Sequence, residues 1–308
     1  MDRRHPRGLL GHARDRRVLP DVRSRPDCQR MTNQRNHPPR TTAGPAGAGR
    51  GTRAGDCVIP GSPYSLESMA AYDLLAAHYD AVTGDSSTEA TFIDEIIKHA
   101  CRRAVTVLEV ACGTADIIAR LAATYQVSGL DISPGMLAVA REKLPEGTPL
   151  YLADMSSFEL GTTFDVIFCV YHGINHLLDF SDWENFFDCV YRHLNGGGVL
   201  IFDIITVRNL EMMASVRQTV QQFGDNYLLI KVRASDEAHF DWDIEVYELQ
   251  PSGRYTLLRE VIRTASFPHE KIRRTLGERF SDIITIDTDG SVANDDNENR
   301  TWLVCTKS

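Results

Sequence analysis

Residues Val105–Asp131 constrain the fold of this 308-residue chain more than any other segment. The segment opens with a short apolar, β-branched run that is typical of a strand buried on both faces. A turn of small residues, 111–114, leads into apolar residues at helix spacing, and a second short run ends at Asp131. The pattern predicts a strand, a turn, a helix and a strand of an open parallel sheet. Glu109 and Asp131 then lie at the ends of its two strands.

The predicted turn has the composition of a nucleoside-binding site. In an open parallel sheet, ligands bind beyond the carboxyl ends of the strands, over the first strand-to-helix turn. Small residues there bring backbone N–H groups and the helix N-terminus close to a ligand. An acid such as Asp131 at the next strand end can accept both hydroxyls of a ribose. A dinucleotide site is not supported, because Gly113 is the single glycine of the turn and the G-x-G-x-x-G pattern is missing.

Three segments in order resemble motifs I, II and III of the class I S-adenosylmethionine (SAM)-dependent methyltransferases. They are LEVACGT at 108–114, GLDISPGMLAVARE at 129–142 and LADM at 152–155. The resemblance covers roughly Tyr72 to Lys307. In appearance it is nearest to small-molecule N-methyltransferases of bacterial natural-product pathways, including those acting on nucleotide-linked amino sugars and the glycine/sarcosine type. The chain departs from the pattern at Ala115, where the family usually has glycine, so we expect weaker or slightly shifted cofactor binding.

The resemblance implies a set of cofactor-binding residues. The Glu109–Gly113 turn would pass beside the methionine part of SAM, Asp131 would hold the ribose hydroxyls, and Asp154 would accept from the adenine amino group. The implied residues are Tyr79, Glu109, Ala111, Gly113, Asp131, Ile132, Met136, Asp154, Met155 and Val170. The alternatives are that Asp131 caps the following helix and that Tyr79 packs an N-terminal helix onto the domain.

Methyl transfer from a sulfonium is a direct displacement, which depends on an aligned nucleophile and exclusion of water more than on a base. The resemblance implies His176 as the catalytic residue that orients the acceptor amine or receives its proton, since a histidine pKa is ordinarily about 6.5. His172 is a second catalytic candidate, and Tyr72 is expected in a lid over the cofactor. Tyr171 and Arg300 are implied to bind the acceptor, Arg300 through an anionic group. Alternatively, the histidine and tyrosine rings are structural residues that pack in the core, and Arg300 is an exposed residue beside the acidic loop.

The alternation of strand and helix patterns predicts an α/β fold. We expect a doubly wound, seven-stranded, mostly parallel sheet in residues 64–308, with a small antiparallel β insert at about 225–265 after strand five. Ser133 is expected to cap the helix that begins at Pro134, and Thr88 the helix before the first strand. Further helices are predicted at 69–81, 88–101, 117–122, 182–194 and 267–276. Strands are predicted at 105–108, 125–130, 150–153, 164–170, 199–205, 228–233, 242–249, 255–263, 283–286 and 301–306.

Composition divides the chain near residue 64. Residues 1–63 are rich in Arg, Pro and Gly and lack Phe and Trp, so we expect a disordered leader. An over-extended gene start with Met69 as the natural start, a transit peptide and a nucleic-acid-binding arm are three open interpretations. Residues 1–68 have a net charge of +7 and the rest −16, and the acidic body disfavours nucleic-acid binding.

The remaining predictions concern partners and location. The seven scattered cysteines form no C-x-x-C pair, which indicates reduced thiols in a cytosolic protein. No apolar run is long enough to span a membrane. No metal site is expected, because the acidic segment 287–298 lacks the ligand spacing of a calcium loop. We expect a small-molecule substrate and a homodimer formed through the β insert.

The resemblance therefore implies SAM-dependent methyl transfer, with an amine nitrogen of a small molecule in a bacterial antibiotic pathway as the acceptor. A small-molecule O-methyltransferase would share the same cofactor half, and a SAM-binding regulator without catalysis is a further alternative. A nucleic-acid amino methylase would carry an Asn/Asp-Pro-Pro-aromatic tetrad after strand four, where this chain has Val-Tyr-His-Gly at 170–173. The sequence does not identify the acceptor.

Overall fold

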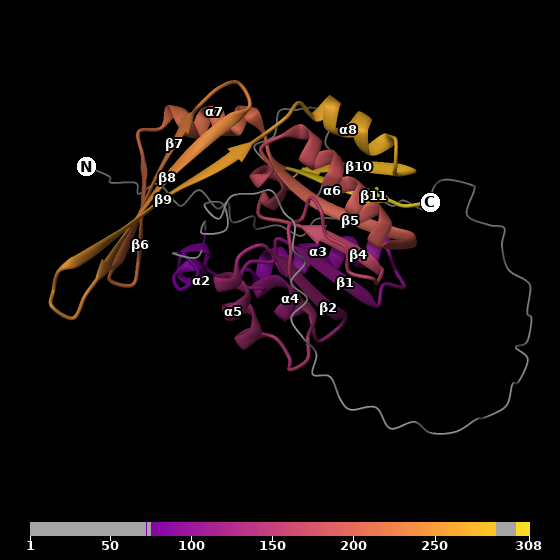
Figure 1. Cartoon of the computed structure of the whole chain (residues 1–308), viewed down its shortest axis with the longest axis horizontal. Coiled ribbons are helices and arrows are strands. Elements are labelled where there is room, and N and C mark those ends of the chain that lie inside the picture. Colours follow the sequence, from indigo (N-terminus) through magenta and orange to yellow (C-terminus); the bar gives the residue numbers. More distant parts are fainter. Residues whose placement is uncertain (1–71, 73–74, 288–299) are drawn as a thin grey trace, which may run out of the picture. The chain divides into compact units, whose positions relative to one another are not determined.

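The computed structural model describes residues 72, 75–287 and 300–308 (Figure 1). Within them, seven strands form a sheet in the order β10-β11-β5-β4-β1-β2-β3. Only β11 runs antiparallel to its neighbours among these strands, pairing with β10 and β5. This confirms the predicted doubly wound, mostly parallel sheet. The strands are β1 (Thr106–Val110), β2 (Gln126–Asp131), β3 (Leu150–Leu152), β4 (Phe164–Cys169), β5 (Leu194–Ile205), β10 (Asp282–Asp287) and β11 (Arg300–Thr306).

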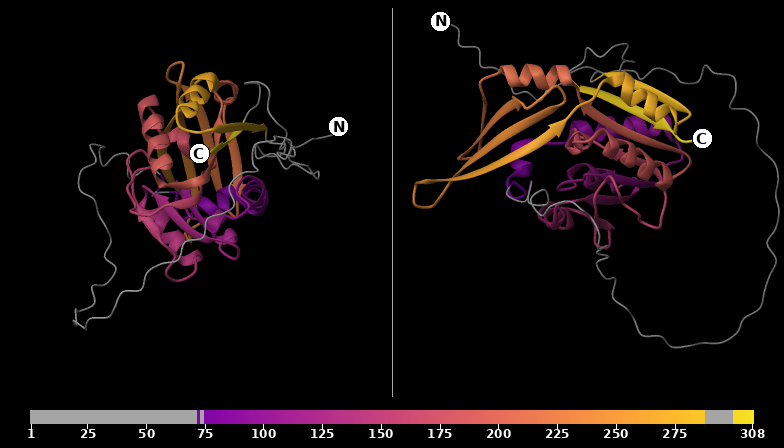
Figure 2. Two further views of the ribbon diagram at one scale, coloured as in Figure 1. Left: turned by 90° about the vertical axis from the view of Figure 1, so that its right-hand side faces the viewer. Right: turned by 45° about the horizontal axis from the view of Figure 1, so that its top comes forward.

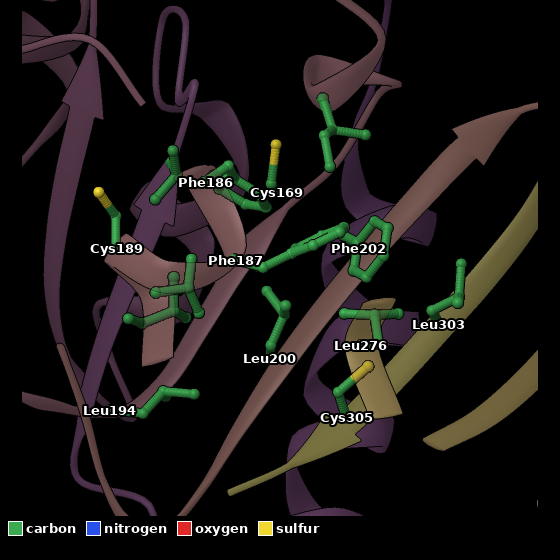
Figure 3. Packing of buried hydrophobic residues seen from close by; sticks show 14 of the residues in the cluster. Cys169, Phe186, Phe187, Cys189, Leu194, Leu200, Phe202, Leu276, Leu303 and Cys305 are labelled. Carbon is green, nitrogen blue, oxygen red and sulfur yellow. The ribbon is translucent and has the colours of Figure 1, made fainter. Parts of the chain in front are cut away.

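Helices cover both faces of this sheet, because its central strands are apolar on both sides. The helices are α2 (Tyr79–Thr83), α3 (Ser87–Ala100), α4 (Asp116–Leu121), α5 (Pro134–Lys143), α6 (Phe180–His193), α7 (Val207–Ser215) and α8 (His269–Gly277), with the 3-10 turn η2 (Gly173–His176). On one face, α6 and α8 pack against β4, β5 and β11 through the main core. Figure 3 shows Phe187 of α6 against Phe202 of β5, with ring centroids 5.7 Å apart. On the other face, Phe92 of α3 meets Trp302 of β11.

The boundaries of several helices differ from those predicted. The predicted helix 69–81 is a turn at residues 75–78 followed by the short α2, and Leu74 lies outside the described residues. The predicted cap Thr88 is wrong: α3 begins at Ser87, whose N–H donates to Asp85 Oδ1 at 3.0 Å. The Ser133 cap is confirmed, since its hydroxyl accepts the Met136 N–H at 3.1 Å.

Strand β5 begins five residues earlier than predicted and includes the Asn195–Gly198 segment that was expected only to stop a helix. Its pairing with β4 shifts register between Phe164 and Val166, which absorbs the extra residues. A Cβ at Gly198 would lie 2.9 Å from the Asn195 carbonyl oxygen and 3.0 Å from that of Asp165. Glycine is therefore required at this close approach of the backbone.

The insert after β5 is larger than predicted. It is a four-stranded antiparallel sheet, sheet B, preceded by α7; the sequence pattern predicted three strands and missed both α7 and the first strand. Its strands are β6 (Thr219–Phe223), β7 (Asn226–Ala234), β8 (His239–Leu249) and β9 (Tyr255–Ala265). β8 and β9 are the long orange strands of Figure 2, with 11 residues each. The inner face of sheet B packs on α7 and on residues 72 and 75.

Residues 1–63, the predicted leader, lie outside the described residues, as does most of the acidic segment 287–298. Five cysteines in the described part of the chain are free thiols, and four of these are buried. Among the helices that the structure describes, none is long and apolar enough to cross a membrane.

Candidate functional site

The ends of β1 and β2 meet at one edge of the sheet, where Asp131 holds the turn after β1. Glu109 of β1 is in register with Gly129 of β2, so the two acids end neighbouring strands. The Gly113 N–H donates to Asp131 Oδ2 at 2.7 Å, and the Ser133 N–H donates to Asp131 Oδ1 at 2.9 Å. The hydroxyl of Ser133 caps α5, so Asp131 is not the helix cap that its position also allowed. Its carboxylate instead joins the turn to the start of α5.

The turn itself has an unusual backbone. Ala111, Gly113 and Ala115 all have positive φ, at 55°, 52° and 61°. Alanine disfavours this region because its Cβ crowds the backbone, so two alanines here store strain of roughly 1–3 kcal/mol each. Ala115, the departure from the glycine pattern, is completely buried at the start of α4. The strained turn persists because β1, β2 and Asp131 fix it from both sides.

Glu109 is a buried acid, and one of its carboxylate oxygens has no hydrogen-bond partner among the described residues. Its side chain is 3% exposed, and Oε2 has no hydrogen-bond partner. Burial raises the pKa of Glu109 well above its ordinary range, and the nearby Asp131 carboxylate adds to the effect. A buried polar atom left unpaired is unfavourable. This unpaired oxygen beside a backbone turn is therefore a candidate ligand contact.

The structure brings most of the other predicted cofactor residues to this edge. Asp154 and Met155 follow β3, which pairs with β2 next to Asp131. Asp154 Oδ1 accepts both the N–H and the hydroxyl of Ser156 at 2.7 Å, which orders the turn after β3. Ile132 directly follows Asp131, Met136 is buried in the first turn of α5, and Val170 is buried at the end of β4.

Tyr79 and Asp80, at the start of α2, lie against the turn after β1. A Cβ at Gly113 would lie 3.9 Å from the Tyr79 ring, so the tyrosine covers the glycine. The Thr114 hydroxyl donates to Asp80 Oδ1 at 2.6 Å. Lys143, the last residue of α5, pairs with Asp80 at 2.5 Å and donates to the Thr114 hydroxyl at 2.9 Å. These three polar residues form a latch that fastens α2 to the turn.

Replacing Lys143 with methionine is expected to loosen this latch. The variant keeps the aliphatic stem but loses the ammonium, so the free energy of unfolding should fall by about 1 kcal/mol or less. Hydrogen–deuterium exchange of residues 79–83 should accelerate. Lys98→Met is the matched control, because Lys98 pairs with Asp94 at the same 2.5 Å distance on α3. Equal exchange of residues 79–83 in both variants would show that Lys143 does not hold α2.

Tyr72 and His176 form a hydrogen-bonded pair although 104 residues separate them in sequence. The Tyr72 hydroxyl lies 2.9 Å from His176 Nε2, and the two rings meet edge to face. The Tyr72 N–H donates to Glu260 Oε1 of β9 at 2.6 Å. Tyr72 therefore links sheet B to η2, and Tyr79 lies 6.2 Å from it between ring centroids.

Burial makes His176 a neutral imidazole. It lowers the pKa of His176 to about 4, against the opposing effect of a hydrogen bond to the Arg263 backbone. Burial also raises the pKa of Tyr72 well above its ordinary range. Near neutral pH the pair is thus an uncharged imidazole and an uncharged phenol, suited to accepting and donating hydrogen bonds to an uncharged amine.

The tip after β4 carries the remaining predicted residues. Tyr171 and His172 both have positive φ, at 55° and 62°. The His172 N–H donates to both oxygens of Asp203 on β5, at 3.2 and 3.3 Å. Arg300 donates from Nε to Asp203 Oδ2 at 2.6 Å and from Nη1 to Glu89 Oε1 at 2.8 Å. Arg300 is accordingly part of a buried ion-pair network, not an exposed residue beside a loop.

Sequence reasoning missed several of these partners. Glu260, Lys143 and Glu89 have no local signal, because each acts through a residue far away in the chain. Asp203 did have a local sequence signal, because it is an acid within an otherwise apolar strand. A charge in such a strand calls for a buried partner, although the sequence does not say which.

Comparison with known proteins agrees with the geometry. Residues 107–198 match the family model described as a methyltransferase domain. A dTDP-4-amino-2,3,4,6-tetradeoxy-D-glucose N,N-dimethyltransferase of Saccharopolyspora spinosa is 31% identical over 143 residues, which cover 46% of this chain and 56% of that protein. A dTDP-3-amino-3,6-dideoxy-alpha-D-glucopyranose N,N-dimethyltransferase of Streptomyces fradiae is 30% identical over 145 residues, 47% and 55% of the two chains. The chain thus spans about half the length of the curated relatives it matches.

Solved structures show the same fold. A SAM-dependent methyltransferase from Clostridium acetobutylicum superposes with a TM-score of 0.67 at 22% identity, covering 77% of this chain and 99% of that one. A sugar N-methyltransferase from Streptoalloteichus superposes with a TM-score of 0.66 at 24% identity, covering 82% and 98%. The predicted resemblance to the class I SAM-dependent methyltransferases is confirmed in the fold, and residues 107–198 match the methyltransferase domain model.

Proposed function

We propose that this protein is a SAM-dependent methyltransferase that methylates an amine nitrogen of a small molecule in a bacterial antibiotic pathway. The observation that carries the proposal is the joined edge of β1 and β2, where the Asp131 carboxylate holds the Gly113 N–H at 2.7 Å beside the buried Glu109. The Tyr72–His176 pair adds a second group of polar atoms from η2 and the N-terminal segment. The methyltransferase domain match over residues 107–198 supports the same conclusion.

The residues at this edge fit the chemistry of SAM. The unpaired Glu109 Oε2 offers an acceptor, and the Tyr79 ring covers the Gly113 turn beside it. Asp131 would take the ribose hydroxyls, and Ile132 and Met136 would flank the adenine. Asp154 and the Met155 backbone would bind the adenine edge, while Ala111 and Val170 would line the remaining wall. When bound, SAM supplies a methyl group on a positively charged sulfur.

The chain's own residues would then bind and orient the acceptor. The Tyr72 hydroxyl, which lies 2.9 Å from His176 Nε2, would accept a hydrogen bond from the amine, and neutral His176 would orient the amine or receive its proton through this hydroxyl. Tyr72 and Tyr79 would close over the site and exclude water, which favours displacement at the methyl carbon. Tyr171 and His172 would form the floor. Arg300 as a contact for an anionic acceptor group stays a prediction.

Amino sugars linked to a nucleotide are the acceptor class that the relatives favour, because those proteins are named as dimethyltransferases of dTDP-amino sugars. The test is to incubate the protein with isotope-labelled SAM and dTDP-3-amino-3,6-dideoxy-glucopyranose, then identify products by mass spectrometry. Labelled methyl groups on the sugar nitrogen are expected. Label on an oxygen would favour the O-methyltransferase alternative. SAM binding by calorimetry without any product, across a panel of amines, would favour the non-catalytic regulator.

Sheet B would pair two copies of the chain. Its outer face exposes six apolar side chains: Val220, Tyr227, Leu249, Tyr255, Leu257 and Val261. The same face carries charges of both signs in cross-strand pairs, among them Arg233 with Asp243 and Arg259 with Glu245. A face with apolar residues and balanced charges is complementary to itself, as a two-fold dimer requires.

A cytosolic location is proposed only because the described cysteines are free thiols.

The double substitution Tyr255→Glu and Leu257→Glu is expected to give a monomer. It adds two negative charges to the apolar part of the outer face of β9, which the proposed dimer would bury. Sedimentation velocity at micromolar concentration should show the parent as a dimer and the variant at half its mass. Met212→Glu on α7, a 45% exposed residue outside this face, is the control and should stay dimeric. A monomeric parent would refute the interface.

A further inference from the structure

The strand-four tip is held in a backbone conformation that its residues disfavour. Tyr171 and His172 are consecutive, and both lie in the left-handed region, at φ 55° and 62°. Side chains with a Cβ rarely adopt this region, and two such residues in succession persist only where the surroundings impose them.

Asp203 and Arg300 hold the tip by hydrogen bonds and an ion pair on its buried side. Asp203 is completely buried in β5 and accepts the His172 N–H with both carboxylate oxygens. Burying a carboxylate in such a place is unfavourable unless a cation pairs with it. Arg300 supplies that charge at 2.6 Å and is itself anchored to Glu89 of α3 at 2.8 Å. The network thus ties the tip to β5, β11 and α3 together.

Further hydrogen bonds fix the chain along η2 as far as His176. The His172 carbonyl accepts the Asn175 N–H at 2.9 Å. The completely buried Asn175 side chain donates to the Ala265 carbonyl at 2.7 Å and accepts the Ile205 N–H at 3.1 Å. His176 is the next residue, with its Nε2 at 2.9 Å from the Tyr72 hydroxyl. Residues 172–176 are therefore one short rigid segment that is fixed at its first residue by Asp203.

We propose that Asp203 and Arg300 are positioning residues, which fix the Tyr171–His172 tip and through η2 aim His176 at the acceptor. The proposal rests on the proposed function, in which His176 contacts the acceptor amine. It gives Arg300 a task besides binding an anionic group. Two of its three guanidinium nitrogens already donate to Asp203 and Glu89, and the third, Nη2, is buried without a hydrogen-bond partner in the described part of the chain, so it alone is left for such a group.

The test uses Asp203→Asn, Arg300→Met and Arg300→Lys in the full chain. Arg279→Met is a matched control, because Arg279 also donates from Nε to an aspartate at 2.6 Å and is 17% exposed, against 16% for Arg300. Its partner, Asp188, lies on α6, away from the tip. The readouts are the His176 resonance in histidine-selective 15N NMR, titrated with pH, and calorimetry with S-adenosylhomocysteine.

Asp203→Asn and Arg300→Met are expected to move the His176 pKa from about 4 back toward the ordinary value of about 6.5. Arg279→Met should lose stability but leave that resonance unchanged, and Arg300→Lys should restore part of the parent titration. The affinity for S-adenosylhomocysteine should stay within about twofold in all variants. With a dTDP-amino sugar, kcat should fall about 100-fold in Asp203→Asn, because a small misplacement of a catalytic group has effects of this size.

Two results would overturn the proposal. One is a His176 titration that is the same in Arg300→Met and Arg279→Met. The other is an Arg300→Met variant whose KM for the dTDP-amino sugar rises while kcat is unchanged, which assigns Arg300 to the anionic group. The NMR comparison needs no turnover, so it decides the positioning role even where no tested amine is methylated.

Discussion

Replacing Asp131 with alanine is expected to lower the affinity for SAM about 100-fold while the chain stays folded. The carboxylate is 8% exposed and has one oxygen on the Gly113 N–H and the other on the Ser133 N–H. It organises the turn and would also accept the ribose hydroxyls. Hydrogen bonds to charged groups contribute about 1.5–3 kcal/mol each. Losing the two hydrogen bonds from the ribose hydroxyls to Asp131 therefore accounts for a loss of affinity of at least this size.

A matched control separates binding from stability for Asp131. Asp165 of β4 also accepts two backbone N–H groups, from Val105 at 2.8 Å and Thr106 at 3.0 Å, but near the amino end of β1. Asp165→Ala should therefore destabilise the sheet without weakening SAM binding. Calorimetry gives the affinity, and thermal unfolding gives the stability of both variants. If Asp131→Ala binds SAM as tightly as Asp165→Ala, the ribose assignment is wrong.

The cofactor edge could be predicted because its information is local. The change from strand to helix pattern within 105–131 fixes one strand-turn-helix-strand unit, and parallel pairing places Glu109 and Asp131 side by side. The Ser133–Pro134 cap signal likewise fixed the start of α5, as the structure shows. In these places local pattern and long-range pairing favour the same structure, so the pattern suffices.

The acceptor side could be predicted only in part, because its contacts are long-range. His176 and Tyr72 were singled out, but no spacing shows that they meet across 104 residues. Strand β6, TVQQF, lacks apolar alternation because most of it is exposed at the edge of sheet B. The Asp203–Arg300 pair joins β5 to β11, and only their antiparallel register brings these residues together. Such pairs depend on the fold, and the local sequence does not encode them.

Replacing His176 with glutamine is expected to lower kcat about 100-fold, in the range that general acid–base and orienting groups contribute. Glutamine keeps a polar side chain but cannot take the amine proton. Because the His176 pKa is about 4, the parent enzyme should show no loss of kcat from this residue near pH 6.5. His172→Gln is the comparison variant, since its ring lies 3.4 Å from Asp203 and apart from the Tyr72 pair. Equal losses in the two variants would contradict the assignment of His176.

Stability against pH gives a second measurement on His176. The unfolded chain binds a proton at this histidine near pH 6.5, whereas the folded chain keeps it neutral down to about pH 4. The unfolded state therefore holds more protons in this window, and the free energy of unfolding falls as the pH is lowered from 6.5 to 4. His176→Gln should flatten this part of the curve in denaturant titrations, although His172, whose pKa burial also lowers to about 4, keeps its own contribution. An unchanged slope would mean that His176 is charged or solvated in the folded protein, and that a neutral imidazole does not face the acceptor.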